Sequence, residues 1–203
     1  MKIGIDLDGV VIDSEQTFRV YEEIYDVDTL RGNNLVDIEE PKFQSRYNWT
    51  EEQEKEFINK YFMKVSKEST LMAGFKEVYN LLKKQGNEFV VITARGGFVK
   101  EMKDDAIRLL EENDIYFDKC FWKVNDKLEV CKSENVDIMI DDDWRIVKKL
   151  SENNIKTLYF RDTNLKRLEE NDYIKEINNW GQVYRYIKEN YESWDCKGGN
   201  VIC

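Results

Sequence analysis

The sequence predicts an α/β fold, a three-layer sandwich in which a parallel sheet of five strands is covered by helices on both faces. Short apolar runs alternate along the chain with amphipathic stretches, which is typical of repeated strand–helix–strand units. The runs are continuous and rich in Val, Ile and Phe, as strands buried on both faces are. The length of 203 residues suits one sizeable domain with a small insertion.

Five apolar runs are the expected strands, and the amphipathic stretches between them are the expected helices. The strands are expected at 2–7, 88–93, 116–122, 136–141 and 155–160. Helices are expected at 74–86, 99–114 and 144–154, with a further short helix beginning at Lys127. The first of these helices places Phe75, Val78 and Leu82 on one face and ends at Gly86, a residue that suits a helix C-terminus.

One segment interrupts this alternation. Residues 14–73 contain no convincing buried strand and predict helices at roughly 14–26 and 50–68, around a polar loop that holds the only proline, Pro41. A strand-to-helix connection needs only a few residues, so we interpret 14–73 as a helical cap. The core then comprises 1–13 and 74–203. Most aromatic residues of the insertion are expected to form its own interior, with one or two facing the core.

The composition excludes several kinds of site. The chain has no histidine, which excludes a His-containing catalytic triad, His-ligated zinc and a His general base. Its net charge of −10 argues against nucleic acid or an anionic membrane as a partner. The sequence opens on a strand without a signal peptide or membrane span, so we expect a cytoplasmic protein. Four cysteines form no close metal-binding pair, and no role is assigned to the tail 194–203, which holds two of them.

Acidic residues follow two of the predicted strands. Asp6 and Asp8 share one strand face and precede Gly9, which leaves the backbone free to turn away from them. Asp141, Asp142 and Asp143 follow the fourth run. An alternative is that the acids have only structural roles: Asp6 and Asp8 would be turn residues, and Asp143 would be the N-cap of a helix. Since the carboxyl ends of parallel strands meet at one edge of a sheet, these acids are expected to lie close together. They should repel one another unless a cation lies between them, and a site made of carboxylate oxygens favours Mg²⁺.

Groups that suit an anion occur at the same edge. Thr93, Ala94 and Arg95 follow the second run, where a hydroxyl and successive backbone N–H groups are expected to bind phosphate. The alternative role of Thr93 is an N-cap for the helix that follows. Lys127 begins a helix, where a cation opposes the helix dipole, so its position favours a function over the alternative of a solvated surface lysine. Lys123 is the alternative lysine.

Four motifs together resemble those of the haloacid dehalogenase-like phosphohydrolases, which have a Rossmann-like core. They are "DLDGV", "VITAR", a lysine before the fourth strand and "MIDDD", in the family's order, and the insertion matches its helical cap. The "ITAR" and "IDD" forms are most similar to the branch of cytosolic 5′-nucleotidases and deoxyribonucleotidases. Trp144 and Arg145 depart from the small or polar residues expected after the fourth motif.

The resemblance implies a role for each motif residue. Asp6 is the nucleophile that forms an aspartyl-phosphate, and Asp8 is the general acid and base. Mg²⁺ is held by Asp6, the backbone carbonyl of Asp8 and Asp142, with Asp141 or Asp143 in support. Phosphate oxygens are held by Thr93, Ala94, Arg95 and Lys127.

The activity implied is Mg²⁺-dependent hydrolysis of a phosphomonoester, a small phosphorylated molecule that we expect to be a (deoxy)nucleoside monophosphate. A sugar phosphate or another small phosphoester is the alternative substrate, because the cap selects the leaving group. A non-catalytic phosphoacceptor or binding module is the alternative from another class. Such modules also place acids and a lysine at strand ends, but they lack the cap and the acid two residues after the acceptor.

Overall fold

The computed structural model describes residues 1–97, 99–162 and 164–191. Within these residues one sheet contains six parallel strands in the order β3–β2–β1–β4–β5–β6. The strands are β1 (Lys2–Ile5), β2 (Glu88–Ile92), β3 (Lys119–Phe121), β4 (Ile138–Asp141), β5 (Lys156–Phe160) and β6 (Ile174–Ile177). The α/β fold with a parallel sheet is confirmed, and β1 pairs with both β2 and β4 at the centre.

The predicted number of five strands is wrong, because β6 adds a sixth at the edge of the sheet. It pairs with β5 through Ile174 and Ile177, which are buried, while Lys175 between them is exposed. Four residues with two apolar side chains do not form the continuous apolar run that identified the other strands. As an edge strand, β6 has too few apolar residues to be recognised as a strand in the sequence.

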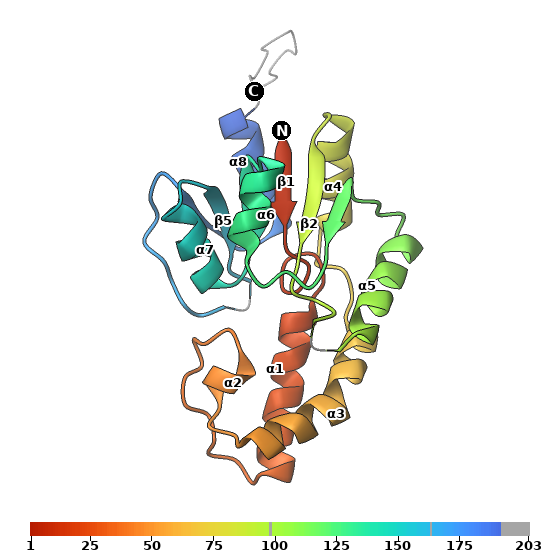
Figure 1. The fold of residues 1–203 in the computed structure, drawn as a ribbon, viewed down its shortest axis with the longest axis vertical. Helices are drawn as coiled ribbons and strands as arrows, with labels where there is room; N and C mark the ends of the chain where they lie inside the picture. Colours follow the sequence, from red (N-terminus) through yellow and green to blue (C-terminus); the bar gives the residue numbers. More distant parts are fainter. Residues whose placement is uncertain (98, 163, 192–203) are drawn as a thin grey trace, which may run out of the picture.

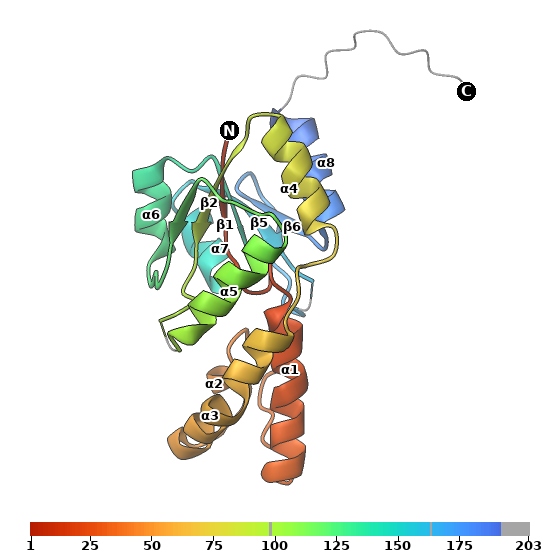
Figure 2. The ribbon, with the colours of Figure 1, turned by 90° about the vertical axis from the view of Figure 1, so that its right-hand side faces the viewer.

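Helices cover both faces of the sheet, as predicted. α4 (Phe75–Lys84), α5 (Glu101–Glu112) and α8 (Trp180–Tyr191) share one apolar cluster with alternate residues of the strands, such as Ile3 and Ile5. α6 (Lys127–Glu134) and α7 (Trp144–Ser151) pack with the residues that point the other way. Figure 2 shows α6 and α7 on one side of the strands and α4 and α8 on the other. The result is a three-layer arrangement.

The insertion after β1 is helical. It contains α1 (Ser14–Ile24), a π-helix (Tyr25–Thr29), the short α2 (Phe43–Arg46) and α3 (Glu51–Glu68), which lie beyond the carboxyl end of β1 (Figure 1). Thr50 and Gln53 form a capping box that fixes the start of α3. The interior of this helical cap is a separate aromatic cluster, which includes Met102 of α5. The cap therefore packs directly against a core helix.

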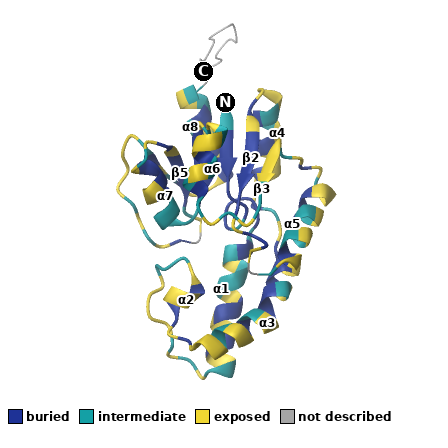
Figure 3. Cartoon of the chain, viewed as in Figure 1, coloured by how far each residue is buried: buried dark blue, intermediate teal, exposed yellow. Residues whose placement is uncertain are grey.

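The loop between the π-helix and α2 is held by one buried arginine. Arg46 is 1% exposed and pairs with Glu15 and Glu22 of α1. It also donates hydrogen bonds to the carbonyls of Glu40 (2.9 Å) and Pro41 (3.0 Å). The loop therefore has a fixed path, even though most of its residues lie on the exposed surface in Figure 3.

The same loop contacts the core. Lys166 pairs with Glu39 at 2.9 Å, and Arg145 lies 4.0 Å from Glu40. Arg145, which departed from the family pattern, thus joins the core to the cap. In the described part of the chain, no helix has the length and apolar character needed to cross a membrane.

Candidate active site

A tight loop follows β1 and carries both Asp6 and Asp8. The backbone N–H groups of residues 10–12 all donate to the carbonyl of Leu7, at 2.8–3.3 Å. Gly9 has φ of +70°, and a Cβ atom there would lie 2.3 Å from Oδ2 of Asp142. A side chain at position 9 would therefore displace an acid of the neighbouring strand. Close approach, as well as the turn, requires glycine here.

Lys127 links two carboxylates from adjacent strands. Its ammonium nitrogen lies 2.9 Å from Oδ2 of Asp6 and 2.6 Å from Oδ2 of Asp141. All three residues are buried, with exposed fractions of 8% or less. Although burial opposes its charge, the two acids raise the pKa of Lys127, which therefore stays cationic. Burial raises the pKa of Asp141 to about 7, against the opposite effect of Lys127.

Three carboxyl groups form a cluster that suits a divalent cation. Oxygens of Asp6, Asp141 and Asp142 lie within 4.8 Å of one another. Burial and the neighbouring acids raise the pKa of Asp142 well above its usual range, and burial raises that of Asp6 despite Lys127. Oδ1 of Asp6 is buried and has no hydrogen-bond partner among the described residues.

The charge of this cluster matches Mg²⁺. When ionised, the three carboxylates exceed the Lys127 ammonium by two negative charges. Both oxygens of Asp141 already accept hydrogen bonds, from Lys127 and from the backbone N–H of Asp143. Asp6 and Asp142 therefore remain the natural ligands, and all-oxygen donors suit a hard cation. The expected juxtaposition of "DLD" and "DDD" is thus found.

Asp143 has the capping role that was considered for it. It is the N-cap of α7, and its side chain accepts from the backbone N–H of Arg145 at 2.9 Å. The Arg145 guanidinium also pairs with it, at 2.7 Å, which helps to hold the pKa of Asp143 below its usual range. Its carboxylate is thus engaged in starting α7.

Asp8 has two partners at a single oxygen. Its Oδ1 accepts from the Ser14 hydroxyl at 2.5 Å and from the guanidinium of Arg95. The sequence suggests only the backbone N–H of Arg95 as a phosphate ligand, and in the structure this N–H donates to Oγ1 of Thr93 at 3.2 Å. Its side chain gave no signal in the sequence, because an arginine in a turn is usually solvated. The burial of the Arg95 side chain becomes apparent only in the folded structure.

The remaining predicted groups lie in a turn at residues 93–97. Thr93 is 1% exposed, and Ala94 lines the cavity that contains Asp6. The expectation that Thr93 caps the following helix is wrong, because α5 begins at Glu101 and its N-cap is Lys100. Lys123, the alternative lysine, is exposed, whereas Lys127 contacts Asp6.

Two cavities meet at Asp8. One, of about 230 Å³, is lined by Asp6, Lys127 and Asp142. The other, of about 330 Å³, lies towards the cap, and its apolar lining is Phe18, Phe43, Phe62, Val99 and Met102. Three cap aromatics therefore face the core, rather than one or two. Glu15, Pro41 and Lys42 of the cap line both cavities.

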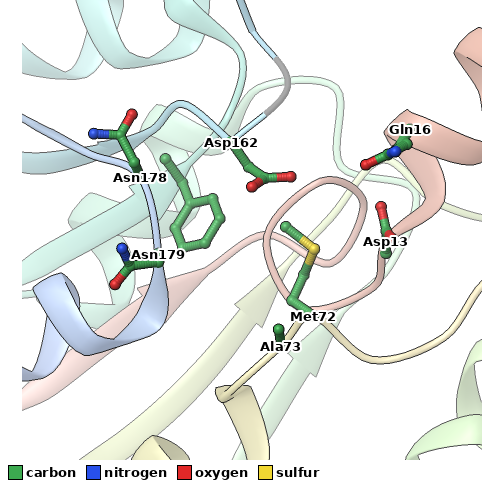
Figure 4. Close-up of a pocket in the computed structure, with 8 residues that line it drawn as sticks. Asp13, Gln16, Met72, Ala73, Asp162, Asn178 and Asn179 are labelled. Carbon is green, nitrogen blue, oxygen red and sulfur yellow. The ribbon is translucent and has the colours of Figure 1, made fainter.

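A third cavity, of about 220 Å³, lies where the chain passes between cap and core (Figure 4). Asp13 lines it from the connection into α1, Gln16 lines it from α1 itself, and Met72 lines it from the returning connection. Asp162 contributes from the core, and burial together with this neighbour raises the pKa of Asp13. Neither Asp6 nor Asp142 lines this cavity, so it is separate from the acidic cluster.

Known proteins resemble the chain over nearly its whole length. A curated nucleotidase of Clostridium acetobutylicum is 26% identical over 198 residues, which cover 95% of this chain and 96% of the relative. No family model matches the chain.

Solved structures share the fold. A haloacid dehalogenase-like family hydrolase from Streptococcus pneumoniae has a TM-score of 0.67 at 17% identity, covering 92% of this chain and 97% of that one. The crystal structure of a predicted phosphatase from Clostridium acetobutylicum has a TM-score of 0.65 at 20% identity, covering 93% of this chain and 98% of that one. At such identities these two structures establish the fold.

Proposed function

We propose that this chain is a haloacid dehalogenase-like hydrolase, and that it acts as a Mg²⁺-dependent phosphomonoesterase on nucleoside monophosphates. The observation that carries the proposal is the position of Lys127, whose ammonium contacts Asp6 in a cavity that also contains Asp8 and Asp142. This arrangement offers a nucleophile, an acid–base group and a cation around one space.

The chemistry assigns different tasks to the two acids of the first motif. A carboxylate oxygen of Asp6 attacks phosphorus while the bond from phosphorus to the leaving oxygen breaks, and protonated Asp8 gives its proton to that oxygen. Asp8, now ionised, then accepts a proton from the water that attacks the aspartyl-phosphate. Inorganic phosphate leaves, Asp6 is restored, and Asp8 is protonated again.

Charge neutralisation explains the rest of the site. Asp6, the backbone carbonyl of Asp8 and Asp142 would hold Mg²⁺, which when bound offsets the negative charge of the acids and the phosphate. The Lys127 ammonium lies beside Asp6 and would also contact a phosphate oxygen. Like charges about 4 Å apart at an effective dielectric of about 20 repel by roughly 4 kcal/mol, so substrate binding requires these cations. We retain the Thr93–Arg95 turn as the second part of the phosphate site.

The larger cavity supports a nucleoside as the leaving group. Phe18, Phe43 and Phe62 give it an aromatic wall beside Asp8, and an aromatic ring can stack on a base. The full-length relative is named a nucleotidase. We propose the helical cap, residues 14–73, as the part that selects the leaving group. The alternative, a sugar phosphate, would use the polar groups of the same cavity, such as Glu15, Lys42 and Gln44.

A substrate screen tests this function. The purified protein with Mg²⁺ is assayed for phosphate release from nucleoside monophosphates, sugar phosphates and p-nitrophenyl phosphate. Asp6→Asn should abolish release from all of them, whereas Asp172→Asn, at an exposed acid, should not change it. Preference for sugar phosphates would select the alternative substrate. Stable phosphorylation without turnover would instead identify a phosphoacceptor module.

A further inference from the structure

We propose that the Arg95 side chain is a positioning residue that holds Asp8 in the orientation required for proton transfer. The inference rests on the proposed function, because it concerns how the acid–base group is held. It goes beyond the motif, which suggested only the backbone of Arg95 as a phosphate ligand. It also assigns a role to a buried cation that the phosphate chemistry leaves unused.

Three parts of the chain fix the guanidinium of Arg95. Its Nε donates to the carbonyl of Met102 in α5 at 2.8 Å, and one terminal nitrogen donates to the Ser66 hydroxyl in α3 at 3.2 Å. The other terminal nitrogen donates to Oδ1 of Asp8. The Arg95 side chain is 1% exposed, whereas that of Asp8 is 33% exposed. The arginine is therefore rigidly held, and the acid that it contacts faces the cavity.

Asp8 accepts one hydrogen bond from Arg95 and one from Ser14, and both use the same carboxylate oxygen. Oδ1 accepts from Arg95 and from Ser14, so a proton on Oδ1 would compete with a cationic donor. The mobile proton is therefore carried by Oδ2, and the pair of donors fixes the direction in which that oxygen points. After proton transfer, Arg95 neutralises the ionised carboxylate and keeps it available as the base for the second step.

A purely structural role would have a different consequence from a positioning role. If Arg95 only stabilises the fold, its loss should slow the reaction of every phosphate ester by a similar factor. If it positions Asp8, the loss should depend on how much the leaving oxygen needs a proton. p-Nitrophenolate leaves readily without one, but an alkoxide such as the 5′-oxygen of a nucleoside does not.

The experiment compares kcat/KM for p-nitrophenyl phosphate and for an alkyl phosphate that the wild type hydrolyses. Arg95→Met should raise the ratio of the aryl to the alkyl value by about tenfold or more, up to the roughly 10²–10⁴-fold expected for complete loss of acid catalysis. Arg95→Lys, which keeps the charge, should raise it less. Arg108→Met removes an exposed arginine that pairs with Asp105 on α5, and should leave the ratio unchanged.

Asp8→Asn separates this inference from the proposed function. In that variant the ratio should already be raised, and adding Arg95→Met should raise it no further. An unchanged ratio in Arg95→Met, with Asp8→Asn strongly impaired, would overturn the positioning role alone. No hydrolysis by the wild type, or full activity in Asp8→Asn, would overturn the proposed function itself. If Arg95→Met does not fold, Arg95→Gln, which also removes the cation but keeps a polar side chain, provides the same comparison, and an unchanged ratio there would overturn the inference.

Discussion

The ammonium nitrogen of Lys127 lies 2.9 Å from the carboxylate of Asp6. The two residues are 121 positions apart in the sequence, and the pairing of β1 with β4 brings their elements together. The same nitrogen also contacts Asp141, the last residue of β4. One cation thus stabilises two buried acids.

Loss of Lys127 should be costly for folding. Lys127→Met leaves Asp6 and Asp141 buried without their cation, and breaking a buried ion pair from one side costs about 3–5 kcal/mol. Urea unfolding at pH 8 without metal measures the change. Lys123→Met, at the exposed alternative lysine, is the matched control and should change stability by less than about 0.5 kcal/mol. Equal stability of the two variants would contradict the burial of an essential cation.

A methyl group at position 9 should disturb Asp142. Gly9→Ala adds a Cβ atom 2.3 Å from Oδ2 of Asp142, so this carboxylate must move. Mg²⁺ affinity should then fall by about tenfold or more, as it does when a residue that orients a metal ligand is lost. Gly32→Ala is the control, because Gly32 has φ of +78° but nothing within 4 Å of the added atom. Both variants carry the backbone strain of a left-handed residue, about 1–2 kcal/mol. Calorimetric titration with Mg²⁺ compares them, and equal affinities would refute the contact.

The stability of the metal-free protein should fall as pH rises towards 7. Burial raises the pKa of Asp141 to about 7 from 3.8, and the pKa values of Asp6 and Asp142 are also raised. The folded state therefore retains protons that the unfolded state loses between those values, so unfolding becomes easier as pH increases through this window. Below pH 3.8 the effect disappears because both states are protonated. Thermal unfolding in EDTA from pH 4 to pH 8 measures it.

Mg²⁺ should reverse this trend. Because protons and the cation compete for the same carboxylates, stabilisation by a fixed Mg²⁺ concentration should be small near pH 5 and should grow towards pH 8. The measurement is the difference in melting temperature with Mg²⁺ and with EDTA. Asp142→Asn should remove most of the difference at every pH. A shift that is independent of pH, or that survives this substitution, would place the metal elsewhere.

Continuous apolar runs allowed most of the sheet to be predicted. The strands of the centre are buried on both faces, so their sequences contain little else, and the acids that follow them are conspicuous. β6 was missed because an edge strand needs only two buried residues, Ile174 and Ile177. The helical character of the insertion was also predicted, because residues 14–73 contain no convincing buried strand. No role was assigned to the two cysteines of the tail, Cys196 and Cys203, and both lie outside the described residues.

Only those residues of the candidate site that directly follow strands could be predicted from the sequence. Asp6 and Asp142 were expected to lie together because neighbouring parallel strands end at the same edge, and their carboxylate oxygens do lie within 4.8 Å of each other. The contact of Arg95 with Asp8 depends instead on how a turn after β2, a helix of the core and a helix of the cap meet. No local pattern encodes that meeting. The N-cap expected at Thr93 was also wrong, because α5 begins only at Glu101 and its N-cap is Lys100.

The proposed function requires that Asp6 attacks phosphorus and that Asp8 completes the hydrolysis. Its most direct test is mass spectrometry of Asp8→Asn protein quenched in acid after reaction with p-nitrophenyl phosphate and Mg²⁺. This ester needs little acid catalysis to phosphorylate the enzyme, whereas removal of the phosphoryl group needs the missing base. We expect a phosphoryl group on the peptide that contains Asp6, and none in Asp6→Asn. A phosphoryl group on another residue, or an unmodified Asp6 peptide during continued turnover, would contradict it.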